Sequence, residues 1–162
     1  MFHFLTLDDK AKTVMRWGKA AGESADPLNW RKIYRAIDED IVGINILDDE
    51  NADSLLHYAA GGEGKVTESG IERGRAAIEP MKELIKRGIN INLRNDHYFS
   101  PLHVAMSSGS LQAVNILLDA GAEVSYSLKF MENADIPIEI KQRLIFIFSQ
   151  KENFKVKRNS QC

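Results

Sequence analysis

Two segments of the chain, residues 43–60 and 88–106, repeat the same order of residue types. Each begins with Gly-Ile-Asn-Ile, continues through a polar run, and ends in Ser-Leu-Leu-His-Tyr-Ala-Ala or Ser-Pro-Leu-His-Val-Ala-Met. An internal repeat of this length indicates a solenoid, because one unit cannot bury its apolar face alone and must stack against the next. No other feature of the sequence restricts the possible folds as strongly.

The second segment predicts a turn, two helices and a glycine stop. Ser100 is a suitable N-cap, and Pro101 fits the first helical position, where a missing N–H costs little. A second helix is predicted by the apolar run 114–118, and Gly121 is suited to end it. This order resembles the ankyrin repeat. The resemblance implies an all-α ankyrin-repeat solenoid of about four helix pairs, with two recognisable repeats, atypical terminal caps and short β-hairpin-like loops.

The chain departs from the family pattern at four positions. Leu55 stands where the family has proline, Met106 where it has a small alanine, and Ala52 and Tyr98 where it has the hairpin glycine. The two copies nevertheless keep the same order, so we expect Leu56 and Leu102 to occupy equivalent buried positions in adjacent layers.

We expect the chain to form one domain, residues 1–162, arranged around these repeats. The N-terminal part, 1–42, contains capping helices at 8–21 and 27–40. A repeat with an inserted loop spans 43–92, and a regular repeat spans 93–125. A C-terminal cap at 126–150 and a basic tail at 151–162 complete the chain. In the C-terminal cap, Asp135 is expected to cap a helix whose core comes from the apolar residues of 138–148.

The first repeat is longer than an ankyrin unit. His57 and His103 are 46 positions apart, about 13 more than the roughly 33 residues of the family's unit. The excess falls near 63–75, where we expect a loop inserted between the two helices. Pro80 then lies in the first turn of the second helix; alternatively, it kinks a longer helix that starts near Ile71.

Charge and composition do not suggest a nucleic-acid or membrane partner, and the resemblance implies a protein partner. The formal net charge is −2 and the single cysteine, Cys162, excludes an intramolecular disulfide. The apolar start of the chain is followed at once by Asp8 and Asp9, which argues against a secretory leader. We therefore expect a cytoplasmic protein. The sequence of a bacterial effector delivered by a leaderless route would show the same features.

The two histidines and the glycine-rich insertion are the candidates for chemistry. In the ankyrin resemblance, His57 and His103 hydrogen-bond the backbone between adjacent units, and neither has a metal-ligand cluster beside it in sequence. Residues 59–66 fail the phosphate-loop pattern, because Ala59 and Val66 occupy positions that need glycine and Ser or Thr. We therefore expect no catalytic residue, metal site or cofactor.

The resemblance places the variable residues on a concave surface formed by hairpin tips and inner helices. The expected partner-binding residues are Glu50, Asn51, Asp53, Tyr58, Asp96, His97, Tyr98, Phe99, Ser107, Ser108 and Phe130. Exposed aromatic rings are the expected anchors. The acidic run 48–53 would favour a basic patch on the partner, or it is a solvated turn.

Three functional hypotheses follow. The first is a non-enzymatic protein-binding module, acting as an immunity protein or inhibitor that neutralises a toxin or enzyme, with a secreted effector or adaptor acting on host proteins as the alternative. The second is an enzyme using the polar residues of the insertion, such as Lys65 and Glu72. The third is self-association through exposed repeat ends. Under the first, the chain is a monomer when free or a heterodimer with its partner.

Overall fold

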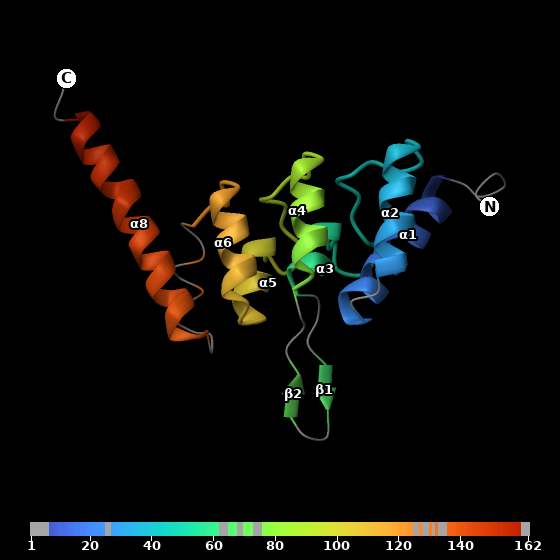
Figure 1. Ribbon diagram of the computed structural model, residues 1–162, viewed down its shortest axis with the longest axis horizontal. Helices are drawn as coiled ribbons and strands as arrows, with labels where there is room; N and C mark the ends of the chain where they lie inside the picture. The colour runs from blue at the N-terminus through green and yellow to red at the C-terminus, as the bar shows by residue number, and fades with distance from the viewer. Residues whose placement is uncertain are drawn as a thin grey trace.

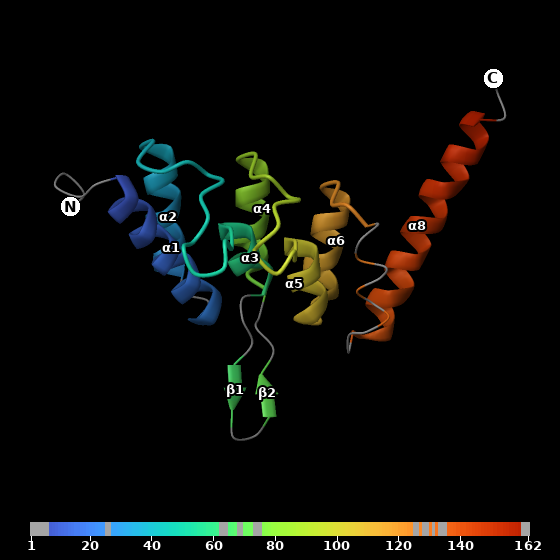
Figure 2. The same ribbon diagram turned by 180° about the vertical axis from the view of Figure 1, so that it is seen from behind.

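The computed structural model shows helix pairs standing side by side in one row, with the two chain ends at opposite ends of the row (Figure 1; Figure 2). It describes residues 7–24, 27–61, 65–67, 70–72, 76–124, 127, 130, 132 and 136–159. Sequential packing of this kind confirms the predicted all-α ankyrin-repeat stack. Within the described residues, no helix is long and apolar enough to cross a membrane.

The first pair consists of α1 (Leu7–Ser24) and α2 (Pro27–Asp38), close to the predicted spans. Asp8 and Asp9 lie in the first turn of α1, where negative charge offsets the helix dipole. A Cβ added at Gly22 would lie 2.9 Å from the Tyr58 carbonyl oxygen. Small residues on α1 therefore let this pair approach α3 (Leu55–Ala60) closely.

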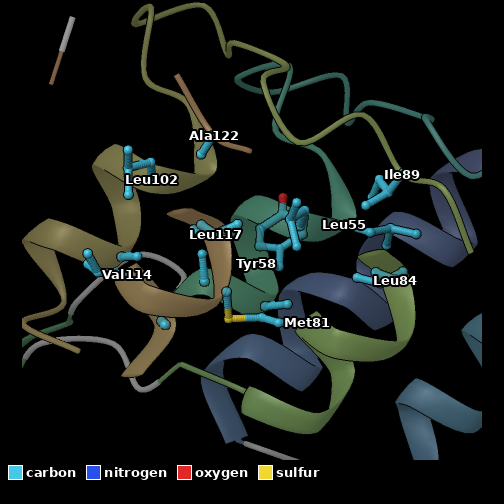
Figure 3. Close-up of a cluster of buried hydrophobic side chains, with 14 of the residues drawn as sticks. Leu55, Tyr58, Met81, Leu84, Ile89, Leu102, Val114, Leu117 and Ala122 are labelled. Atoms are coloured by element: carbon cyan, nitrogen blue, oxygen red, sulfur yellow. The ribbon is translucent and has the colours of Figure 1, made fainter. Parts of the chain in front are cut away.

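Two equivalent layers form the middle of the stack. Helices α3 and α4 (Ile78–Lys86) make one layer, and α5 (Pro101–Ser107) and α6 (Leu111–Asp119) make the next. Leu56 and Leu102, each the second helical residue after its serine N-cap, are both completely buried. Side chains of both layers meet in one cluster (Figure 3). The expected equivalence of the two leucines is confirmed.

The inserted segment contains a short antiparallel hairpin, β1 (Lys65–Thr67) and β2 (Gly70–Glu72), which projects away from the helix row (Figure 1). The Ala77 N–H donates to the Ala59 carbonyl oxygen at 2.7 Å, so the two ends of the inserted segment lie side by side. Because Ile71 lies in β2 and α4 begins at Ile78, the alternative of a longer helix from Ile71 is wrong. Pro80 lies in the first turn of α4.

Helix α8 (Ile138–Asn159) ends the row. It buries Ile140 and Leu144, whereas Ile145 and Phe146, expected to supply core, are more than half exposed on the opposite side of the helix. The helix also continues into the segment expected to be a tail, because 138–159 contains no glycine or proline. The predicted cap residue Asp135 lies outside the described residues.

Asparagine side chains connect successive layers at their outer turns. Asn45 Oδ1 accepts a hydrogen bond from the Asn90 N–H at 2.7 Å, and Asn92 Oδ1 accepts one from the Glu123 N–H at 3.0 Å. Each bond satisfies a backbone donor of the next unit and fixes the spacing between layers.

Truncation of Leu102 should distinguish stacking from local helix stability. We expect Leu102→Ala to lower the free energy of unfolding by about 3 kcal/mol, because it opens a cavity between the layers. Leu111, on α6 and 39% exposed, provides the matched control, and Leu111→Ala should cost less than about 1 kcal/mol. Urea unfolding followed by circular dichroism measures both; equal losses would contradict the shared interlayer core.

Candidate functional site

A pocket of about 230 Å³ lies where two neighbouring polar turns meet the inner helices α3 and α5. Its walls come from both layers: Asp53, His57, Tyr58, Asn95, His97, Phe99, Val104 and Ser107. The turns 48–53 and 95–99 supply the rim, and the helices supply the floor. The pocket therefore exists only because the layers are stacked.

Each turn is closed by a backbone hydrogen bond and contains one left-handed residue. The Asp48 N–H donates to the Asp53 carbonyl oxygen at 2.9 Å, and the Asn95 N–H donates to that of Phe99 at 3.0 Å. Ala52 has φ of 57° and Tyr98 has φ of 62°. These are the two positions where the resemblance placed the hairpin glycine, so the turn conformation is kept although the glycine is missing.

The two turns are also bonded to each other. The Asp96 N–H donates to the Asn51 carbonyl oxygen at 2.8 Å, and Asn95 Nδ2 donates to Asp53 Oδ1 at 2.9 Å. Asn95 in addition accepts the N–H groups of His97 and Phe99 through Oδ1. One buried asparagine thus shapes its own turn and holds it against the neighbouring one.

His57 links the layers beneath the pocket. Its Nδ1 accepts the Ser54 N–H at 3.1 Å, so the neutral ring carries its proton on Nε2, which donates to the Phe99 carbonyl oxygen at 2.9 Å. Burial lowers the pKa of His57, although the bond to Phe99 and the nearby Asp53 and Asp48 act in the opposite direction. His103 makes the same Nδ1 contacts with Ser100.

Tyr58 and Asp48 form a polar contact beside the pocket. The Tyr58 hydroxyl donates to Asp48 Oδ2. Burial raises the pKa of Tyr58, and the Asp48 hydrogen bond raises it further. Burial opposes the ionisation of Asp48, but the Tyr58 hydroxyl and the N–H groups of Asn51 and Glu50 outweigh it and lower the pKa of this carboxyl. The tyrosine therefore remains a hydrogen-bond donor.

The structure brings part of the predicted partner-binding set together in this pocket. Asp53, Tyr58, His97, Phe99 and Ser107 line it. Asp96 and Tyr98 lie exposed on the same turn, and Tyr98 is 77% exposed. The Phe130 ring packs edge-on against Phe99, with a centroid distance of 5.3 Å. Phe99 and Phe130 thus pack together, and the exposed Tyr98 precedes Phe99 in the same turn.

The other predicted residues, Glu50, Asn51 and Ser108, have internal partners, and the Asn51 N–H donates to Asp48 Oδ1 at 2.8 Å. Ser108 Oγ donates to the Ala105 carbonyl oxygen at 2.9 Å, at the end of α5. Glu50 pairs with Lys19 at 2.5 Å, and its neighbour Asp49 pairs with Lys12 at 3.5 Å. Asp53 is buried. The acidic run is therefore not an open negative patch, because two lysines of α1 pair with it. These lysines lie far from the run in the sequence.

Three pocket residues were not among the predicted partner-binding residues: His57, Val104 and Asn95. Asparagine accepts backbone N–H groups two and four residues ahead in such turns, and its position near the start of the polar run 94–99 is the available signal. Its bond to Asp53 joins residues 42 positions apart and has no local signature. In the part of the chain that the structure describes, no group of three or more His, Cys, Asp or Glu side chains could hold a metal ion.

Comparisons with known proteins agree with this architecture. Residues 33–127 match a family described as "Ankyrin repeats (3 copies)". Over 46 residues, 28% of this chain, the sequence is 35% identical to the E3 ubiquitin-protein ligase KEG of Arabidopsis thaliana. Over 90 residues, 52% of this chain, it is 33% identical to "Putative palmitoyltransferase ZDHHC13" of Danio rerio. The aligned segments span 3% and 14% of these relatives.

Acidification should weaken the link made by His57. Because its pKa is lower in the folded than in the unfolded chain, the unfolded chain binds the proton first as the pH falls. The stabilisation is complete above the unfolded pKa of about 6.5 and is lost as the pH falls below that value. We expect urea unfolding to show a lower free energy of unfolding at pH 5.5 than at pH 7.5.

The His57→Gln variant is the control for this prediction. At pH 7.5 it should be less stable than the parent chain by about 1–3 kcal/mol, because buried backbone groups lose their partner. Its loss of stability between pH 7.5 and 5.5 should be smaller. An identical pH dependence in both proteins would show that another group is responsible.

Proposed function

This chain belongs to the ankyrin-repeat family, whose repeats form protein–protein interaction modules, and we propose that it binds its partner through the surface around the second turn. We call this region, made of the pocket and the exposed residues Asp96 and Tyr98, the tip surface. In this proposal it acts as an inhibitor or immunity protein, which occupies a toxin or enzyme and performs no chemistry itself.

One observation carries the choice of this surface: Tyr98 is 77% exposed and has φ of 62°. A left-handed conformation costs a non-glycine residue about 1–2 kcal/mol, and glycine would avoid that cost. The exposed ring contributes little to the core. A strained, exposed aromatic residue is therefore better explained by contact with another molecule than by folding.

The surroundings of Tyr98 also suit a protein partner. Phe99, the next residue of the turn, packs against Phe130, and the pocket offers a mostly apolar recess with a few polar groups. Binding energy in protein interfaces concentrates on a few aromatic anchors near well-packed pockets. The turn is held rigidly by Asn95 and by its bond to the neighbouring turn, so little ordering entropy is lost on binding.

The inhibitor role is supported by the combination of a preorganised tip surface and the β1–β2 hairpin, which stands away from the helix row (Figure 2). An element that projects from the binding module is able to reach into or cover the active site of a bound enzyme. Both features suit steric inhibition, which needs tight contact and no catalytic group.

Co-expression with the products of neighbouring genes tests this proposal. We expect a stoichiometric complex to co-purify, and co-expression of the chain to rescue growth if the captured product is toxic. A complex without rescue or inhibition would leave the binding module and overturn the inhibitor role. No stoichiometric partner among these products would overturn the immunity version.

Replacement of Tyr98 should separate binding from stability. Tyr98→Gly should raise the free energy of unfolding by about 0.5–1 kcal/mol, because relief of the left-handed strain exceeds the entropy that glycine loses on folding. The same change should weaken partner binding about tenfold or more in isothermal titration calorimetry. Gln112→Ala, on exposed α6 surface, should change neither; unchanged affinity in Tyr98→Gly would contradict the proposed surface.

A further inference from the structure

We propose that the pocket of the tip surface receives a cationic side chain of the partner protein, with arginine as the best fit, and that Asp53 is its counter-ion. This inference rests on the proposed function, because it names the chemistry by which that surface recognises a protein. It goes further by predicting a residue type on the partner and an affinity that depends on one carboxylate.

Asp53 is the observation from which the inference starts. The residue is only 7% exposed, yet no lysine or arginine of the described chain forms an ion pair with it. Its Oδ1 accepts a hydrogen bond from the neutral side-chain amide of Asn95. Aspartate is almost never buried without a charged partner or a full set of donors, because removal of its hydration is costly. A cation supplied from outside would complete the site.

The other walls of the pocket favour a positive charge and offer none of their own. The eight lining residues include no lysine or arginine. His57 is held neutral by the Ser54 N–H at Nδ1, and burial lowers its pKa. The rings of Tyr58, Phe99 and His97 surround the recess, and aromatic faces attract cations. The nearby acidic side chains differ from Asp53, because Glu50 and Asp49 already form ion pairs with lysines.

The dimensions of the pocket suit one side chain. Its volume of about 230 Å³ lies below the roughly 300–1,000 Å³ of small-molecule and cofactor sites. A long side chain entering from the partner would fill it with its charged end beside Asp53. Arginine fits better than lysine because its planar guanidinium stacks on rings and presents several donors, and the Asp53 carboxylate can accept more than one of them.

The test uses N-acetyl-arginine amide as the probe, with N-acetyl-citrulline amide as its neutral isostere. The ligands are titrated into the full chain and followed by ¹H–¹⁵N NMR at pH 7. We expect saturable shifts at the amides of Asn95, Phe99 and Ser107 with arginine. Citrulline should bind at least about tenfold more weakly, because a charge-assisted hydrogen bond is lost. N-acetyl-lysine amide provides the comparison between the two cations.

Two variants make the test specific. Asp53→Asn removes the charge but keeps an oxygen to accept from Asn95, so the fold should persist and arginine binding should fall about tenfold. Ser107→Lys places a competing cation at an exposed position at the end of α5 and should weaken arginine binding without disturbing the core. Circular dichroism melts establish that both variants fold.

The outcomes separate this inference from the proposed function. No saturable shift, equal shifts with arginine and citrulline, or unchanged binding in Asp53→Asn would overturn the cation pocket. If a protein partner then binds the Asp53→Asn variant normally but loses affinity on Tyr98→Gly, the proposed function stands without the cation pocket. If arginine binds as expected but no protein partner needs the tip surface, the pocket stands as a cation site and the proposed function falls.

Discussion

No helix pair of this chain can bury its apolar side chains without a neighbour, and this constraint explains the rest of the structure. Leu56 and Leu102 are completely buried because their layers stack. Polar links then fix the spacing: His57 reaches the Phe99 carbonyl oxygen, and Asn45 reaches the Asn90 N–H. Stacking brings the polar turns into contact and so creates the pocket between them. Folding and the formation of the tip surface are therefore one event.

The parts of the fold that follow from local chemistry could be predicted from the sequence. The serine caps, the paired histidines and the equivalent leucines all depend on spacing within one repeat. The ion pairs of Lys12 and Lys19 with the acidic turn could not be predicted, because they join α1 to a segment 31 or more positions away. The exposure of Ile145 and Phe146 was also missed, since hydrophobicity alone does not say which side of a terminal helix meets the stack.

Two features of the tip surface each cost the folded chain free energy. Tyr98 keeps a left-handed backbone that glycine would adopt more easily, and Asp53 remains buried without a cation among the described residues. In the proposed function, a bound partner compensates for both features. The predicted residues His97 and Phe99 lie near both, whereas the bond between Asn95 and Asp53, which connects the two turns, could not be predicted from the sequence.

The bond between Ala77 and Ala59 has a consequence for how this protein can change. Since the two ends of the inserted segment are adjacent, its length is uncoupled from the register of the layers, and each doubling adds only about 0.6 kcal/mol of closure entropy. Sequences of different length and specificity could therefore replace the inserted segment while α3 and α4 remain packed. An engineered domain whose termini lie close together could be grafted at the same junction.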